Sequence, residues 1–445
     1  MTNLSDKIFG VGGTFVPDII VDASGKGDYT SIQTAVNASS DSDVIFVRNG
    51  IYNETGSIQL KFGTKLIGES KEGVKLNSTS SSVIQFKSNV TSIVRTQRTT
   101  NNLGSDQSGG LGTISLTNGS ATATKSGSSG IATGWKLAIG VDDIFTLSNV
   151  SGNTLTLDRP WRGPTNLSAP IPDRAVGIAF QSTLGVDDYN LVSNMTIESS
   201  SSGAGCCYAS GVFRPTIINC HFICNNTSVN QNTGAFAFYQ SIFGRVIDCS
   251  AEQTVAGNCH SIYSCFGLVM RGYKTKGSDS NFISGGTIAP NNYLDLEYES
   301  ISSSYQYFVN NSLPQAIDSR FHIKRMVDTY GWANTPSGSS EPYVNCHFKF
   351  DVCKLIPTNG ISSFHGRNNT FEFGNWYGGG GNANYLSVKS SADSSGTSTT
   401  NLIISGRLDL ASSTGLQVDG SVIIGGSVIY TSLLGTPKQN GGFSF

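Results

Sequence analysis

Three acidic residues alternate with apolar ones in the stretch YLDLEYES, residues 293–300. Side chains alternate between the two faces of an extended strand, so Asp295, Glu297 and Glu299 share one face. Residues two apart on a strand lie about 6.6 Å apart, and neighbours on adjacent strands about 4.8 Å. Glycosidases hold two carboxyl groups about 6.5–9.5 Å apart for inversion and about 5–5.5 Å for retention. The spacing therefore predicts glycoside hydrolysis, in which one acid protonates the leaving oxygen and another activates water.

The segments that follow carry further charges at the matching strand positions. They are His322 and Lys324, then His347, Lys349 and Asp351, then Glu372. Opposite charges on neighbouring strands stabilise a sheet, so a charge-balanced outer stripe without a catalytic role is the alternative interpretation. A polysaccharide lyase would instead use Lys324 or Lys349 as the base that abstracts a sugar C5 proton. Hydrolysis is the preferred prediction.

Aromatic residues gather in two segments rich in Gly, Ser and Asn, DTYGWANTPSGSSEPY and FGNWYGGGGNANY. Loops of this composition leave little core for a ring to fill, and exposed rings suit stacking on the faces of pyranose sugars. The predicted substrate-binding residues are Tyr330, Trp332, Tyr343, Trp376 and Tyr377. The alternative is that these rings cover the flank of the fold or meet a neighbouring subunit.

Other catalytic chemistries leave no recognisable pattern. The sequence has no G-x-S-x-G elbow between a strand and a helix, no GxGxxG and no Walker A motif. Its five histidines stand singly, and His221, His322 and His347 are predicted to point outward beside inward apolar residues. A metal site needs two or three such side chains in register, so we predict no metal and no cofactor.

The elements that position these residues are short strands that recur along the chain. From about residue 190 onward they are LVSNMTIESS, PTIINCHFIC, GRVIDCSAEQ, GLVMRGYKTK, NYLDLEYESI, RFHIKRMVDT, YVNCHFKFDV, NTFEFGNWYG, NLIISGRLDL and GSVIIGGSVIY, each roughly 20 to 31 residues after the last. A strand this short buries its apolar face only by stacking on similar neighbours. The predicted fold class is all-β, a right-handed parallel β-helix, with Cys220 and Cys249 stacked in consecutive coils.

One amphipathic helix is predicted near the N-terminus. In GKGDYTSIQTAVNAS, the residues Ile32, Ala35 and Val36 recur at helical spacing, and Thr30 with Gln33 has the form of a capping box. We expect about ten helical residues that start at or next to Thr30. The end of a β-helix exposes strand edges and apolar side chains, which promote aggregation, so this helix is predicted to cap it.

Three N-terminal segments, VDASGKGDYTSIQTAVNAS, DVIFVRNGIYNE and KLIGES, together resemble the cap and first coils of the pectin lyase-like superfamily, in the order used by pectinesterases and many bacteriophage tailspikes. The resemblance implies a β-helix and leaves the activity open, because this superfamily contains lyases, hydrolases, esterases and binding proteins. Pectinesterase activity is not expected. SIFG, residues 241–244, lacks the Asp of the pectinesterase strand, and Arg159-Pro160-Trp161 lies far from a suitable coil.

The strand rhythm breaks between Thr96 and Phe180. This segment has its own alternation at Trp135, Leu137 and Ile139, which predicts a small inserted β-domain. The pattern TNGSATAT, GWKLAIG and FTLSNVSGNTLTLDRPW resembles a module of phage tail and tailspike proteins. The alternative is an elaborated loop that covers the flank of the β-helix.

The composition favours a neutral polysaccharide as partner. Charged residues make up 13% of the 445 residues, against about 25% in a typical soluble domain, and the formal net charge is -2. With 29 Lys+Arg against 31 Asp+Glu, the chain does not supply the basic face that nucleic acid requires. The longest apolar run is too short to span a bilayer and no apolar leader opens the chain, so no membrane insertion is expected.

Cysteines are frequent and clustered. Seven of the nine lie between Cys206 and Cys265, with no CxxC pair. We interpret them as buried thiols of a protein made in a reducing compartment, and a disulfide cluster is the alternative.

These residues and resemblances together predict a phage tailspike-like receptor-binding protein of the virion, assembled in the host cytoplasm. It would recognise a host cell-surface polysaccharide, with depolymerisation of that polysaccharide as the expected further activity. The resemblance implies a homotrimer. The alternatives are a non-catalytic virion structural or decoration protein and a free bacterial polysaccharide lyase or glycoside hydrolase.

The predicted organisation has five parts. They are an N-terminal arm (1–20) that docks on other phage tail proteins, the capping helix with the first coils (21–95), the inserted β-domain (96–180), the main β-helix (181–435) and a C-terminal tail (436–445).

Overall fold

The computed structural model describes residues 16–80, 82–95, 114–127, 130–139, 143–163, 165, 177–182, 185, 188–200, 205–225, 235–253, 258–263, 265–277, 279–281, 289–290, 293–300, 307–310, 316–317, 319–329, 331–333, 343–344, 346–355, 361–367, 369–377, 385–390, 401–405, 407–410, 415–418, 421–424 and 427–430. These residues form one α-helix and strands β1–β41. Most of the predicted N-terminal arm and all of the predicted C-terminal tail lie outside the described residues.

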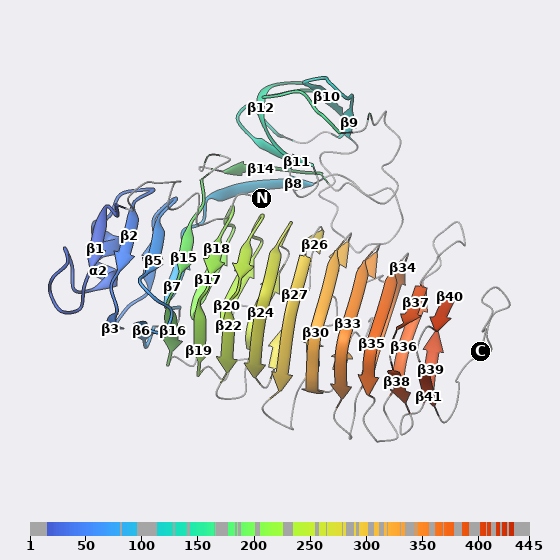
Figure 1. Ribbon diagram of the computed structural model, residues 1–445. Helices are drawn as coiled ribbons and strands as arrows, with labels where there is room; N and C mark the ends of the chain where they lie inside the picture. The colour runs from blue at the N-terminus through green and yellow to red at the C-terminus, as the bar shows by residue number, and fades with distance from the viewer. Residues whose placement is uncertain are drawn as a thin grey trace.

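The described strands stack as a parallel β-helix, which confirms the predicted fold class (Figure 1). Each coil opens with a strand that pairs in parallel with its counterpart in the next coil. These strands are β2 (Val44–Val47), β5 (Lys65–Gly68), β15 (Leu191–Ser193), β18 (Thr216–Ile218), β21 (Arg245–Ile247), β24 (Val269–Gly277), β27 (Tyr293–Ser300), β30 (Arg320–Thr329), β33 (His347–Leu355), β35 (Thr370–Tyr377), β37 (Asn401–Ile404) and β40 (Ser421–Ile424).

A second strand follows a corner in each coil and belongs to the same sheet. It is formed by β3 (Gly50–Glu54), β6 (Val74–Ser78), β16 (Thr196–Ser199), β19 (His221–Cys224), β22 (Ser250–Gln253), β38 (Arg407–Leu410) and β41 (Ser427–Tyr430). Strands β24, β27, β30, β33 and β35 are long enough to run through both positions, which is why the two faces join into one 20-stranded sheet.

Further strands close the coils on the remaining side, again in parallel. The earlier coils contribute β4 (Ile58–Leu60), β7 (Ile84–Phe86), β17 (Cys207–Ser210), β20 (Phe236–Tyr239), β23 (Asn258–Tyr263) and β25 (Asp279–Asn281). The later coils contribute β26 (Ala289–Pro290), β28 (Tyr307–Asn310), β29 (Ala316–Ile317), β31 (Gly331–Ala333), β32 (Tyr343–Val344), β34 (Ile361–Arg367), β36 (Tyr385–Ser390) and β39 (Gly415–Val418).

Like residues stack inside the coils. The rings of Phe321 and Phe348 lie 4.6 Å apart and those of Phe348 and Phe371 lie 4.9 Å apart, with interplanar angles of 3° and 11°. A second stack places Phe350 5.2 Å from Phe373. The spacing of parallel strands, about 4.8 Å, suits offset stacking of rings, so the register that pairs the backbone also builds the core.

The corner between the first and second strand repeats from coil to coil. Asn194, Asn219 and Asp248 have φ values of 56°, 50° and 51°, and Gly272 takes their place with φ 63°. Asparagine and aspartate tolerate this left-handed conformation better than other residues with a side chain. Asn219 Nδ2 also donates a hydrogen bond of 2.9 Å to Asn194 Oδ1, so the stacked corners support one another.

The described cysteines are buried thiols, as the sequence predicts. Cys220 and Cys249 occupy matching positions before β19 and β22, and the Cys220 amide donates to Cys249 Sγ at 3.4 Å. Burial raises the pKa of Cys220 well above its usual value. These thiols therefore pack as small apolar groups.

Helix α2 (Ile32–Ala38) starts one residue after its N-cap, Ser31, whose Oγ accepts a hydrogen bond from the Thr34 amide. The predicted capping box of Thr30 and Gln33 is wrong, because Ser31 is the N-cap and the carboxylate at this end of the helix comes from β3. Glu54 accepts bonds from the Ile32 amide at 2.7 Å and from Ser31 Oγ at 2.9 Å. A negative charge at this end complements the helix dipole.

The predicted apolar face of the helix is buried. Ile32, Ala35 and Val36 have no exposed surface and belong to the same core as the first coils. The helix has seven residues, fewer than the ten expected. Figure 1 shows α2 beside β1 (Ile19–Val21) and β2, at the N-terminal end of the stack.

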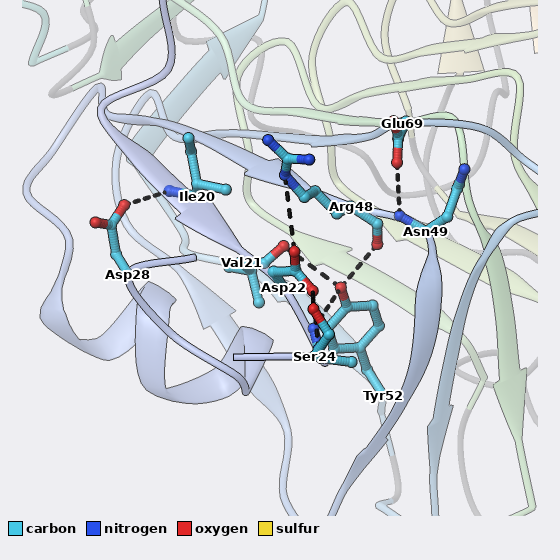
Figure 2. Close-up of polar contacts among 10 residues, drawn as sticks. Ile20, Val21, Asp22, Ser24, Asp28, Arg48, Asn49, Tyr52 and Glu69 are labelled. Atoms are coloured by element: carbon cyan, nitrogen blue, oxygen red, sulfur yellow. Dashed lines mark hydrogen bonds and ion pairs between the residues drawn. The ribbon is translucent and has the colours of Figure 1, made fainter. Parts of the chain in front are cut away.

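A polar network ties β1 to the first coils (Figure 2). Asp22 accepts from the Ser24 amide at 2.8 Å and from Ser24 Oγ at 2.7 Å, which lowers its pKa, and it lies 3.8 Å from Arg48 Nε. Tyr52 Oη donates to the Arg48 carbonyl at 2.7 Å, and Glu69 accepts from the Asn49 amide at 2.8 Å. The loop after β1 is thus held against Arg48, which follows β2, and against Tyr52 of β3.

An antiparallel sheet interrupts the coils after β7. Its strand order is β8-β14-β11-β12-β13-β10-β9, and it has a separate apolar core. The strands are β8 (Val90–Arg95), β9 (Ile114–Leu116), β10 (Thr122–Lys125), β11 (Lys136–Ile139), β12 (Asp143–Ser151), β13 (Thr154–Leu157) and β14 (Gly177–Ser182). The sheet reaches beyond the predicted limits at Thr96 and Phe180, because β8 and β14 pair with each other on its outer side.

Aromatic contacts dock this sheet on the β-helix. Phe180 of β14 lies 5.2 Å from Phe213, which in turn lies 6.3 Å from Phe243, and Phe243 lies 5.4 Å from Phe266. All four rings are buried in one cluster. In Figure 1, β8 and β14 cross over the parallel strands at this place. No helix among the described residues is long and apolar enough to cross a membrane.

One histidine lies in the core. His260 of β23 is fully buried, stacked on Phe236 at 5.8 Å and edge-on to Tyr273 at 5.4 Å. Burial lowers the pKa of His260 to about 3. The folded protein therefore holds a neutral imidazole there at pH values where the unfolded chain binds a proton.

The first prediction concerns the helix. Ile32→Asp or Val36→Asp places a charge in the core of the first coils and should lower the free energy of unfolding by about 3–5 kcal/mol. Asn37→Asp, on the exposed side of α2, is the matched control and should change it by less than about 0.5 kcal/mol. Urea denaturation followed by circular dichroism measures both; equal stability of core and control variants would refute the capping role.

The second prediction concerns His260. Because the folded pKa of about 3 is below the unfolded value of 6.5, this residue costs stability as the pH falls through 6.5 towards 3. The loss from this residue between pH 7 and pH 5 should be about 2 kcal/mol. His260→Phe should remove that part of the pH dependence in urea titrations at the two pH values. An unchanged pH dependence in the variant would contradict the buried neutral imidazole.

Candidate functional site

The predicted acids lie on β27, in the middle of the main sheet. Their backbone register places Asp295 opposite His322 of β30. Glu297 lies opposite Lys274 and Arg325, and Glu299 lies opposite Lys276 and Val327. The side chains of the three acids lie outside the described residues. The backbone position of Glu297 is flanked by basic residues on both neighbouring coils, and those of Asp295 and Glu299 each face His322 or Lys276 on one of them.

Described side chains extend this charge pattern over β30, β33 and β35. His322 Nε2 lies 2.8 Å from Asp351 Oδ2. Glu372 lies 3.3 Å from Lys349 Nζ and 3.8 Å from His347 Nε2. We name these five residues the charged ladder. Each of these contacts joins two consecutive coils.

The charged ladder repeats one geometry. His322 is directly opposite Lys349, and its acid partner Asp351 lies two residues further along β33. His347 is directly opposite Thr370, and its acid partner Glu372 again lies two residues further along. Each histidine thus reaches diagonally to the next coil, within the reach of long side chains. The result is an alternation of basic and acidic side chains across consecutive coils.

The ladder is partly accessible to solvent. Asp351 is the more open acid, with 42% of its side chain exposed, and Glu372 has 24% exposed. Burial lowers the pKa of His347; the charge of Glu372 opposes that shift, while Arg320, Lys349 and His322 add to it. The side chains can therefore meet a ligand while their orientation is fixed by pairing.

The predicted aromatic residues have different outcomes. Tyr330 lies outside the described residues, and Trp332 of β31 and Tyr343 of β32 are described only by their backbone. The placement of Trp376 in an exposed loop is wrong: it belongs to β35, is 1% exposed and packs on Phe373 at 4.8 Å. A ring buried in this way has no face for a sugar.

Tyr377 is exposed, as predicted, although it stands on a strand and not in a loop. It is the last residue of β35, and 36% of its surface is exposed. It lies opposite Lys354 of β33. The same strand carries Glu372, so an aromatic ring and an acid of the charged ladder belong to one coil.

The outward histidines agree with the sequence prediction. His322 and His347 belong to the ladder, and His221 Nδ1 lies 2.8 Å from Ser250 Oγ on the next coil. Within the described ranges, no three His, Cys, Asp or Glu side chains come together as they would around a metal ion.

Sequence reasoning noted the ladder residues but missed which of them pair. Predicting these pairs requires the length of each coil. His322 and Asp351 are 29 residues apart, whereas His347 and Glu372 are separated by a shorter coil. Aligning the Phe-x-Phe motifs of β33 and β35, which stack directly, could have found the second pair.

The chain matches no protein-family model and no curated protein sequence. Among solved structures it is similar to the tailspike protein gp49 from Pseudomonas phage LKA1, with a TM-score of 0.48, 13% identity, and coverage of 91% of this chain and 72% of that chain. It is also similar to the tailspike gp61 of Pseudomonas phage phi297, with a TM-score of 0.35, 11% identity, and coverage of 89% and 72%.

A third similar structure is the Gp54 tailspike of Acinetobacter baumannii bacteriophage AP22, in complex with A. baumannii capsular saccharide. Its TM-score is 0.31 and its identity 14%, with coverage of 91% of this chain and 71% of that chain. At such identities and TM-scores the similarities identify no site residue in this chain.

The third prediction tests the ladder around His347. Glu372→Gln should lower the pKa of His347 further, because it removes the negative charge that opposes the shift. Lys349→Met should raise that pKa, because it removes a positive charge. Titration of the imidazole signals by NMR in protein with labelled histidine measures both. Lys26→Met, an exposed lysine at the N-terminal end, should leave it unchanged; shifts of the same sign in the two ladder variants would contradict the pairing.

Proposed function

We propose that this protein is a receptor-binding protein of the phage tailspike type that binds a host cell-surface polysaccharide along the outward face of β27, β30, β33 and β35. The observation that carries the proposal is the charged ladder. It presents donors and acceptors on neighbouring coils, with the exposed ring of Tyr377 beyond the corner of the coil that carries Glu372.

Carbohydrate binding suits this face for physical reasons. Sugars offer hydroxyl groups that donate and accept hydrogen bonds, and their apolar ring faces stack on aromatic side chains. Groups held in place before binding lose little conformational entropy when the ligand arrives. The nearly neutral charge of the chain matches an uncharged or weakly charged polysaccharide better than a nucleic acid.

The remaining parts of the proposal follow from the sequence resemblance. The protein would act as a homotrimer in the phage tail, would be assembled in the host cytoplasm, and would contact other tail proteins through its N-terminal arm. A non-catalytic decoration protein would use the same face for binding alone.

Hydrolysis of the bound polysaccharide is the second candidate function. It is favoured by the register that places Asp295, Glu297 and Glu299 on one strand beside the ladder. Opposite charges on the flanking coils stabilise ionised carboxylates, and a partner acid that keeps its proton completes an inverting pair. Asp351 and Glu372 supply two further carboxylates on adjacent coils, offset from each other by two residues along the strands.

The fourth prediction tests both functions with one assay. Purified protein is incubated with a panel of capsular and O-antigen polysaccharides, and binding and chain length are measured by calorimetry and mass spectrometry. We expect binding of one polysaccharide, and about tenfold weaker binding by Tyr377→Ala, equivalent to about 1.4 kcal/mol. Ile51→Ala removes an exposed apolar residue from the first coils and should bind normally.

Catalysis is tested with the isosteric variants Asp295→Asn, Glu297→Gln and Glu299→Gln. Cleavage should fall at least a hundredfold in one of them while binding is retained. Cleavage at the wild-type rate in all three would exclude these acids. Binding without any cleavage would favour the decoration protein, and no binding across the panel would refute the proposed function.

A further inference from the structure

Two thiols from consecutive coils lie side by side in the core. Cys206 Sγ and Cys224 Sγ are 3.4 Å apart, and neither residue has exposed surface. Cys206 comes directly before β17, and Cys224 ends β19 in the next coil. The two residues are separated by 18 positions in the chain, so a bond between them would link one coil to its neighbour.

The backbone around the pair places Cys206 between the coils. Its Sγ contacts the carbonyl of Ile197 on β16 at 3.2 Å and the carbonyl of Ile223 on β19 at 3.4 Å. Cys224 lies directly opposite Ser199 in the parallel pairing of these two strands. A disulfide needs a sulfur separation of about 2.05 Å, so closure from 3.4 Å requires side-chain rotation and no exchange of strands.

We propose that Cys206 and Cys224 are a site of oxidative modification, at which a peroxide converts the two thiols into a disulfide that joins consecutive coils. The peroxide oxidises one thiol to a sulfenic acid and leaves as water. The second sulfur then attacks the first, the sulfur–sulfur bond forms, and the hydroxyl group leaves with the remaining thiol proton as a second water. Two thiols and one peroxide thus give one disulfide and two waters.

The buried position determines when this reaction occurs. Burial raises the pKa of the Cys206 thiol well above its usual value, which disfavours the reactive thiolate and makes the reaction slow. Glutathione is too large to reach a sulfur without exposed surface, so the pair does not exchange with it in the folded protein. A peroxide is close to water in size and reaches the pair through brief local opening. Once formed, the bond is shielded from large reductants in the same way.

The consequence of the bond is a higher barrier to unfolding. Coils of a solenoid contact only their neighbours, and their separation is the elementary step of unfolding. A cross-link that closes this 18-residue segment restricts the unfolded chain and keeps the two coils together. The other thiols remain packing residues.

The fifth prediction is tested on the full chain, without any substitution. Protein prepared with a phosphine reductant is desalted, treated with hydrogen peroxide, blocked with N-ethylmaleimide under denaturing conditions and analysed as an intact mass. We expect two fewer alkylated thiols and a loss of about 2 Da, one hydrogen from each thiol, restored by the reductant. The urea midpoint of the oxidised protein should be higher than that of the reduced protein.

Chymotrypsin locates the bond. Cleavage after Tyr208 separates Cys206 and Cys207 from the later cysteines, and cleavage after Phe222 separates Cys220 from Cys224. Fragmentation of the linked peptides between Cys206 and Cys207 then identifies the partner of Cys224. Cys224→Ser should abolish the link and Cys353→Ser, a buried thiol on β33, should retain it. No link, a link between Cys220 and Cys249, or sulfinic acid on Cys206 without a link would overturn the proposal.

Discussion

Parallel stacking of each coil on the next, at the spacing of hydrogen-bonded strands, is the constraint on which the structure depends. It gives residues of the paired strands counterparts in the neighbouring coils. Inside, this repetition stacks Phe321, Phe348 and Phe371 almost face to face. Outside, it sets Lys349 against Glu372. Core and candidate site therefore follow from one register, and a slip of one residue would exchange the two faces.

The fold could be predicted from the sequence because the same strand pattern recurs in each coil. Alternating strands at coil spacing, one amphipathic helix and a break in the rhythm predicted the β-helix, α2 and the inserted sheet. The partner of the helix N-terminus was not predictable, because Glu54 reaches Ser31 only once β3 is placed beside α2. The limits of the inserted sheet were missed because β8 and β14 are far apart in the sequence and pair with each other only in the folded chain.

The candidate site was less predictable, for a reason visible in β35. Phe371 and Phe373 point inward, two outward residues then form a corner, and Trp376 points inward again. A corner of two residues shifts the alternation by one position, so a ring expected outside lies in the core. The pairs of the charged ladder likewise depend on loop lengths between coils, which strand patterns do not contain. What the sequence identified correctly was the face and the kinds of side chain on it.

The docking of the antiparallel sheet on Phe213, Phe243 and Phe266 has a consequence for how such a chain can evolve. These three rings come from three successive coils, so the sheet packs on a surface formed by equivalent positions of the stacked coils. Duplication or loss of a coil elsewhere would lengthen or shorten the β-helix and leave this docking surface intact. The length of the β-helix and the structure of the attached sheet can therefore vary independently during evolution.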